Sequence, residues 1–130
     1  MALDRYILDS DILIEHLRGR LQARSYITDL KSKGDLLASA ITVAELFAGA
    51  RYEGEKDAIG ALLRLVRIIP VDETIAIKGG LYRQQYGNSH GTGLMDALIA
   101  ATAEAMGANL VTFNRRHFPM IADLQVPYER

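Results

Sequence analysis

The stretch YILDSDILIEHL, from Tyr6 to Leu17, decides how this chain folds. Its first residues are apolar and suit a buried strand, and two carboxylates, Asp9 and Asp11, follow where that strand should end. The first Lys or Arg after them is Arg18. A small polar residue ahead of a helix often caps it, so Ser10 or Asp11 is a candidate N-cap. Capping does not explain Asp9, which therefore becomes a candidate site residue.

The composition predicts a globular protein with one domain over residues 1–130, because domains run to roughly 100 to 200 residues. The chain has no cysteine, which excludes disulfides and thiolate metal sites. A net charge of -1 argues against a protein that coats nucleic acid nonspecifically, so any polyanion contact must be local. No apolar run is long enough to span a bilayer, and the start MALDRYILDSD lacks the features of a secretory signal. We therefore expect a cytoplasmic protein without a membrane partner.

Short apolar runs alternate with amphipathic helices along the chain. The predicted strands are Tyr6 to Asp9, Leu36 to Ser39, Ile68 to Val71 and Asn109 to Phe113, with a short fifth near Leu124 to Val126. Apolar stripes at helical spacing lie around residues 23–30, 43–50 and 59–66. Two more helices are expected, one from an Asp72 N-cap to about Tyr86 and a buried one from Leu94 to Met106 that stops at Gly107. This pattern predicts an α/β fold, with a parallel sheet of four to five strands and helices on both faces.

Two further acids have ordinary structural explanations. The residues from Thr42 to Glu45, TVAE, match the capping box, in which Ser or Thr is followed three residues later by Glu. Asp96 falls in the first turn of a predicted helix, where the macrodipole favours an acid. Neither acid, however, has a Lys or Arg three or four positions away, where helical ion pairs form. Glu45 also shares its helix face with small residues, which would let another group approach the backbone closely.

The acids become costly if the fold brings them together. Ligands of parallel α/β sheets bind outside the carboxyl ends of the strands. Three carboxylates about 5 Å apart there would repel by roughly 10 kcal/mol in total at an effective dielectric near 20, comparable with the whole stability of a domain. Protons or a cation must offset this repulsion, and oxygen ligands suit Mg²⁺ or Mn²⁺. Zinc is not expected, because the three histidines are far apart and we interpret each as a surface or core residue: His16, His90 and His117.

Four segments of the chain are distinctive when taken together: YILDSDILI, SAITVAELFAG, LMDALIAATA and LVTFNRRHF. In this order and spacing they resemble the PIN-domain nucleases, and closely the VapC-type toxins of bacterial toxin–antitoxin modules. The resemblance covers essentially the whole chain and implies a PIN-like fold. It also implies that the three metal-binding acids are Asp9, Glu45 and Asp96, that Asn114 takes the fourth catalytic position, and that the supporting hydroxyl residues are Ser10 and Thr112.

The chain departs from the family pattern at two positions. Asp11 stands where many relatives have Asn. Asn114 is the neutral form of the fourth position, so it can hold a ligated water but adds no charge for a second metal.

The resemblance implies a metal-dependent endoribonuclease that acts as a toxin. A bound Mg²⁺ or Mn²⁺ would polarise the scissile phosphate of RNA and activate a water molecule, which leaves 5′-phosphate and 3′-hydroxyl ends. VapC-type proteins usually form homodimers and are inhibited by a small VapB-type antitoxin. The antitoxin's tail lies across the acidic groove and often places a basic residue among the carboxylates.

Contact with RNA requires positive charge near the acids. The candidates are Arg51, Arg115 and Arg116, although each is also explained as a solvated surface charge. Tyr52 and Phe113 are candidates for stacking on bases. The segment GNSHGTG at residues 87–93 lacks the ending of a P-loop and is interpreted as a flexible loop.

Other functions fit part of the pattern. Asp9-Ser10-Asp11 matches the Asp-x-Asp start of haloacid-dehalogenase-type phosphotransferases, and an acid pair with Asp72 matches a phospho-accepting receiver domain. Both need a downstream Lys, and no Lys follows Lys78. A nuclease-like fold that only binds a partner is a third alternative, against which the intact acids argue.

Overall fold

The computed structural model describes residues 4–130, in which four parallel strands form a sheet in the order β3-β2-β1-β4. The strands are β1 (Asp4–Leu8), β2 (Gly34–Ser39), β3 (Arg67–Ile69) and β4 (Asn109–Val111). The α-helices are α1 (Ser10–Leu17), α2 (Leu21–Lys33), α3 (Ala40–Ala48), α4 (Glu53–Leu63), α5 (Glu73–His90) and α6 (Leu94–Ala105). A 3-10 helix, η1 (Arg115–His117), follows β4. The predicted α/β class with a parallel sheet is confirmed.

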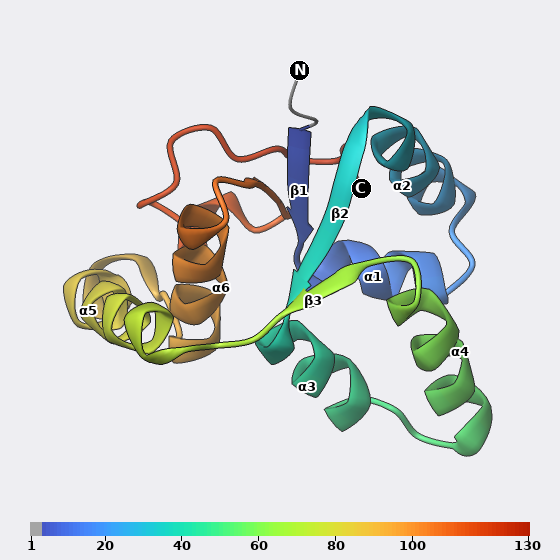
Figure 1. Cartoon of the computed structure of the whole chain (residues 1–130), viewed down its shortest axis with the longest axis horizontal. Coiled ribbons are helices and arrows are strands. Elements are labelled where there is room, and N and C mark those ends of the chain that lie inside the picture. The colour runs from blue at the N-terminus through green and yellow to red at the C-terminus, as the bar shows by residue number, and fades with distance from the viewer. Residues whose placement is uncertain (1–3) are drawn as a thin grey trace.

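Helices cover both faces of the sheet, as predicted. Figure 1 shows α1, α2 and α4 on one side of the strands and α5 and α6 on the other. Successive side chains of a strand point to opposite faces, and β1 follows this rule. Ile7 packs with Ile99 of α6, whereas Leu8 packs with Ile12 and Leu13 of α1. The central strand is thus buried on both faces, and its last residue leads directly into the first site residue.

The strand ends differ slightly from the prediction. β3 stops at Ile69, before the predicted end at Val71, because Pro70 has no N–H to continue the ladder. The prediction of a fifth strand near Leu124 to Val126 is wrong. It is reduced to a single bridge between Gln125 and Val111, because Pro127 follows at once and prevents a longer pairing.

The long helix α5 begins as predicted, but it ends later. The Asp72 side chain caps it by accepting a hydrogen bond from the Ile75 N–H at 2.8 Å. The helix continues through Gly87 to His90, so the expected loop at residues 87–93 is mostly helical. The Arg83 side chain fills the space beside Gly87. Gly91, with φ +67°, stops the helix, since this backbone conformation strains other residues.

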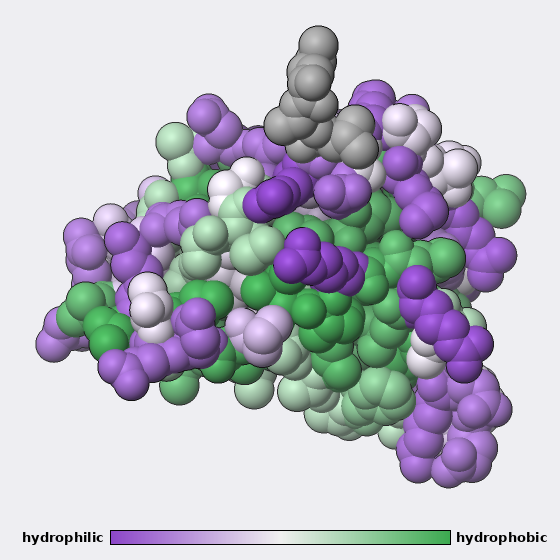
Figure 2. All heavy atoms as spheres, viewed as in Figure 1, coloured by the Kyte–Doolittle hydropathy of each residue, from purple (hydrophilic) through white to green (hydrophobic). Residues whose placement is uncertain are grey.

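Exposed apolar side chains gather over part of the surface. In Figure 2 hydrophobic atoms extend over β3 and α3, bordered by hydrophilic ones. Ile68 of β3 and Phe47 of α3 are exposed, as are Ile77 and Leu81 of α5. Within residues 4–130, no helix combines the length and the apolar character needed to cross a bilayer.

Candidate functional site

The predicted acids come from three elements that meet at the carboxyl end of the sheet. Asp9 directly follows β1, Glu45 lies on α3 after β2, and Asp96 lies in the first turn of α6. The three side chains are close enough to interact electrostatically, because the charge of Asp96 raises the pKa of both Asp9 and Glu45. The fold therefore places the acids at one edge.

Asp9 is the most buried acid of the group, with only 6% of its surface exposed. Its side chain accepts hydrogen bonds from the Ser10 N–H and the Thr112 hydroxyl, both at 2.8 Å. Asp9 is itself the N-cap of α1, so the prediction that Ser10 or Asp11 caps this helix is wrong. Burial and the charges of Asp11 and Asp96 raise the pKa of Asp9 to about 7, although its two hydrogen bonds oppose the rise.

Asp11 supports the site from the first turn of α1. Its carboxylate accepts hydrogen bonds from the Phe113 N–H at 2.9 Å and the Ile12 N–H at 2.7 Å. Burial raises the pKa of Asp11, whereas these bonds and the charge of Arg130 act in the opposite direction. Asp11 thus ties α1 to the chain that leaves β4.

Thr112 links the two aspartates. Its buried hydroxyl lies 2.8 Å from Asp9 Oδ2 and 3.1 Å from Asp11 Oδ2, and it accepts the Asn114 N–H at 3.0 Å. A hydroxyl has one hydrogen, so Thr112 can donate to only one carboxylate at a time. The other contact becomes favourable when a carboxyl group holds a proton, which agrees with the raised pKa of Asp9.

Glu45 is half-buried and incompletely bonded. Its Oε1 atom is buried and has no hydrogen-bond partner within residues 4–130. Burial and the charge of Asp96 raise its pKa, while the Ser10 hydroxyl lowers it. The predicted capping box is wrong, because Ser39 caps α3 by accepting the Ile41 N–H at 3.0 Å. Capping therefore does not account for Glu45, whose buried Oε1 accepts no hydrogen bond from the described residues.

Asp96 and Asn114 meet at His117. Nδ1 of His117 lies 3.2 Å from Asp96 Oδ2 and 2.6 Å from the side-chain nitrogen of Asn114. His117, which we interpreted as a surface or core histidine, is partly exposed and contacts two of the predicted site residues. Because Asn114 begins the turn that forms η1, the histidine three residues later returns to the same edge. That i, i+3 spacing is the sequence signal that could have identified it.

The predicted RNA-contact residues occupy two places. Arg51 precedes α4 and forms an exposed ion pair with Glu55 at 3.0 Å. Arg115 and Arg116 are exposed on η1, next to Asn114. The two groups therefore lie on different elements around the acids.

The two predicted stacking residues have different surroundings. Tyr52 is 62% exposed, so its ring is available to a ligand. The ring of Phe113 is instead occupied within the chain. It packs edge-on against Tyr128 at 5.0 Å between centroids, and the guanidinium of Arg130 lies 4.2 Å from its centroid.

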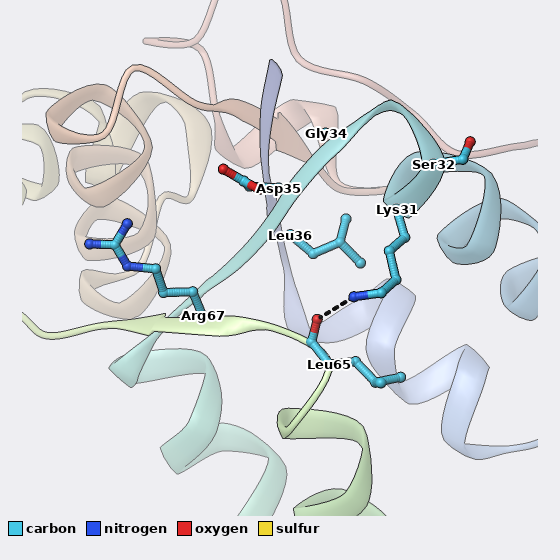
Figure 3. A pocket seen from close by; sticks show the side chains of 7 residues that line it. All are labelled: Lys31, Ser32, Gly34, Asp35, Leu36, Leu65 and Arg67. Carbon is cyan, nitrogen blue, oxygen red and sulfur yellow. Dashed lines mark hydrogen bonds between the residues drawn. The ribbon is translucent and has the colours of Figure 1, made fainter. Parts of the chain in front are cut away.

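A groove of about 590 Å³ runs beside Glu45 between α1, α3 and α4. Apolar side chains and both charge signs line it, including Ile14, Arg18, Arg51 and Tyr52. A second cavity of about 440 Å³ lies where β2 begins, at the opposite end of that strand from the acids. Figure 3 shows Lys31 and Arg67 on its walls and a hydrogen bond from Lys31 to the Leu65 carbonyl. Only the first cavity includes one of the predicted site acids.

The donor set suits a hard cation, although the side chains do not enclose one as they stand. Carboxylate oxygens are the ligands that Mg²⁺ and Mn²⁺ prefer. The unpartnered oxygen of Glu45 and the raised pKa values of Asp9 and Glu45 mark negative charge that a cation would stabilise. Among residues 4–130, no three acidic or histidine side chains form a ready metal-binding group.

Three comparisons relate the chain to known proteins. The model of the PIN domain family matches residues 6–124. The chain is 40% identical over 123 residues to the ribonuclease VapC10 of Mycobacterium tuberculosis, covering 94% of this chain and 92% of the relative. It is 42% identical over 124 residues to the ribonuclease VapC19 of the same organism, covering 94% and 98%. A toxin–antitoxin complex from Klebsiella pneumoniae contains a chain of similar structure, with a TM-score of 0.79, 28% identity and coverage of 96% and 99%.

Proposed function

The chain belongs to the PIN domain family, as a VapC-type member, and from this we propose that residues 1–130 form a single domain that cleaves RNA in the cytoplasm as a metal-dependent toxin. The observation that carries the proposal is the set of acids at the carboxyl end of the sheet. Asp9 and Glu45 are partly or fully buried, both have raised pKa values, and Asp96 contributes to each rise. The ribonuclease names of the relatives support RNA as the substrate.

Asp9, Glu45 and Asp96 are the side chains that would hold Mg²⁺ or Mn²⁺. The buried Oε1 of Glu45 is the strongest support, since a buried carboxylate oxygen without a partner costs free energy. Binding requires at least one side chain to turn, because Asp96 now faces His117. When bound, the ion would act as a Lewis acid on the phosphate and lower the pKa of its water.

The other site residues hold these ligands in place. Thr112 and the backbone of Ser10 fix the orientation of Asp9. Asn114 has a neutral amide that can hydrogen-bond a water molecule or a phosphate oxygen. Water, rather than the ribose 2′-hydroxyl, is then the nucleophile, so we expect 5′-phosphate and 3′-hydroxyl ends.

Arg51, Arg115 and Arg116 would contact the RNA backbone, and the exposed ring of Tyr52 would stack on a base. The Arg51–Glu55 pair does not prevent this, since exposed ion pairs contribute only about 0 to 1 kcal/mol. Each lost phosphate contact should reduce the salt dependence of binding by about one unit of slope. Arg67→Ala is the matched control, because Arg67 begins β3 and lines the second cavity, away from the acids, and an equal effect there would contradict this assignment.

We assign the groove beside Glu45 to a VapB-type antitoxin. Its apolar walls and mixed charges suit a peptide segment, and it leads to the unpartnered Glu45 oxygen, which a basic side chain could satisfy. The complex from Klebsiella pneumoniae contains a toxin and an antitoxin, which supports this kind of partner. Addition of the purified antitoxin should stop RNA cleavage, and unchanged cleavage would refute the assignment.

The homodimer expected from the resemblance also stays a proposal. Ile77 and Leu81 are more than half exposed on the same helix, one turn apart, which is unfavourable for a monomer. Leu81→Arg should shift the sedimentation coefficient from dimer to monomer. A wild-type chain that sediments as a monomer would exclude this proposal.

The activity test uses purified protein, total cellular RNA and Mn²⁺ or Mg²⁺, with EDTA as a control and the chemistry of new ends mapped. Metal-dependent cuts with 5′-phosphates should be absent in Asp96→Asn and retained in Asp35→Asn, an exposed acid far from the site. Cuts that survive EDTA or Asp96→Asn would contradict the proposed mechanism.

A further inference from the structure

His117 lies between two side chains of the proposed site. It ends η1 and is only partly exposed, with 33% of its side chain accessible. One ring nitrogen, Nδ1, is within 3.2 Å of Asp96 Oδ2 and within 2.6 Å of the Asn114 side-chain nitrogen. A single atom of His117 therefore contacts both the third and the fourth predicted positions.

Two hydrogen bonds fix the backbone of His117. The carbonyl of His117 accepts a hydrogen bond from the hydroxyl of Thr92 at 2.8 Å, and Thr92 is buried just ahead of α6. The His117 N–H donates to the carbonyl of Asn114 at 3.3 Å. Gly91 lies beside the ring, since a Cβ there would be in van der Waals contact with Nε2 at 3.5 Å. The segment before α6 and the turn after β4 thus hold the backbone of His117 in place.

The hydrogen-bonding capacity of the groups decides which ring nitrogen carries the hydrogen. An ionised carboxylate only accepts hydrogen bonds, so Nδ1 must carry a hydrogen to bond with Asp96. A ring nitrogen that carries a hydrogen cannot accept a hydrogen bond, so the side-chain amide of Asn114 must turn its oxygen towards the ring. Such an exchange of amide oxygen and nitrogen is compatible with the structure, because the two atoms are assigned from their hydrogen bonds. Both neighbours then accept from the same Nδ1–H.

We propose that His117 is a positioning residue whose Nδ1–H holds Asp96 and Asn114 as one unit. The inference rests on the proposed function, because it concerns how the acidic site is prepared for its metal and substrate. Through this contact His117 sets the direction of the Asp96 carboxylate and leaves the NH₂ group of Asn114 free to donate elsewhere. It does not itself exchange a proton with the substrate.

Substitutions that move the donor separate this role from a general structural one. Asn at position 117 places an NH₂ group near the position of Nδ1, whereas Gln places it near Nε2. In a titration of RNA-free protein with Mn²⁺, followed by the EPR signal of the free ion, His117→Ala and His117→Gln should weaken binding about 10- to 100-fold and His117→Asn by only about threefold. His90→Ala is the matched control, since His90 contacts Ser89 and Tyr86 on α5 instead.

Nitrogen NMR of the unsubstituted histidine provides a second measurement that does not depend on a variant at position 117. At pH 8, His117 should carry its hydrogen on Nδ1, and Asp96→Ala should shift the hydrogen to Nε2. Mn²⁺ is left out of this experiment, so it does not depend on metal binding or cleavage.

The outcomes are distinct. Wild-type Mn²⁺ affinity in His117→Ala, an equal loss in all three variants, or an Nε2–H form in the wild type would each overturn the proposal. If the wild type fails to bind Mn²⁺ and to cut RNA, the proposed function is wrong and the inference fails with it. If the wild type binds and cuts while the His117 variants do the same, only the inference fails.

Discussion

Replacing Asp9 by Asn should stabilise the metal-free protein while it removes activity. The pKa of Asp9 is raised to about 7 from an ordinary value of 3.8, because the carboxylate is buried beside Asp11 and Asp96. This is a shift of about 3 units, and each unit corresponds to about 1.4 kcal/mol. The ionised carboxylate therefore lowers the free energy of unfolding by on the order of 4 kcal/mol.

The pH dependence follows from the direction of this shift. The folded protein holds the Asp9 proton more tightly than the unfolded chain, so stability is fully present below about pH 4 and is lost as the pH rises to about 7. Asn is neutral throughout, and its oxygen can still accept the Ser10 N–H. Asp9→Asn should match the wild type near pH 4 and exceed its free energy of unfolding by about 2 to 4 kcal/mol at pH 8.

Urea unfolding followed by circular dichroism, with EDTA present, measures this difference. Asp35→Asn is the matched control, because Asp35 is exposed and should behave as the wild type at both pH values. Added Mn²⁺ should stabilise the wild type, by about 2.7 kcal/mol at 100 times its dissociation constant, but not Asp9→Asn. The reasoning would be refuted if the free energy of unfolding of Asp9→Asn did not exceed that of the wild type at pH 8, or exceeded it equally at both pH values.

Two further predictions concern the parts of the fold that support the site. Thr112→Val should lower the free energy of unfolding by about 1 to 3 kcal/mol, because it leaves the buried Asp9 carboxylate and the half-buried Asp11 carboxylate without the hydroxyl that they share. Thr102→Val, which loses only a bond to its own helix, should cost less in the same urea experiment. Gly34→Ala should cost about 3 kcal/mol or more, since the new Cβ would lie 2.0 Å from the Asp4 carbonyl oxygen. Gly60→Ala on α4 meets nothing within 4 Å and should be neutral or stabilising, so equal thermal shifts for the two glycine variants would contradict the packing argument.

The sequence predicts the sheet well because each strand contains a short run of apolar, mostly buried residues. Hydrophobic periodicity and the residues that interrupt it located all four strands to within two residues of the structure. Asp72 was predicted correctly as a helix cap. The ends of helices and strands are harder to predict, because each depends on single residues and on the side chains that pack against them. The continuation of α5 through Gly87 is an example, since Arg83 packs beside that glycine and local propensity does not include this contact.

The residues of the proposed site could be predicted from the sequence, but the hydrogen bonds between them could not. Sequence pattern and resemblance predicted Asp9, Glu45, Asp96 and Asn114 as site residues, and the structure brings the three acids among them to one edge. His117 was missed because its importance depends on where a short turn returns the chain, which periodicity does not report. The predicted caps of α1 and α3 were also wrong, since the polar residue directly before each helix, Asp9 or Ser39, caps it instead of a later candidate.

The energetics of the acids connect the proposed metal and the proposed antitoxin. The same buried charges that cost the free protein stability make any cation placed among them favourable, whether it is a metal ion or a basic side chain. Asp9 and Glu45 cannot be fully neutralised by both at once, because both Asp9 oxygens already accept hydrogen bonds and only one buried oxygen of Glu45 is unpartnered among the described residues. A basic antitoxin segment in the groove beside Glu45 should therefore weaken Mn²⁺ binding as well as block RNA. Inhibition would then follow from competition for the same uncompensated charge, and by linkage Mn²⁺ would weaken the antitoxin by an equal factor.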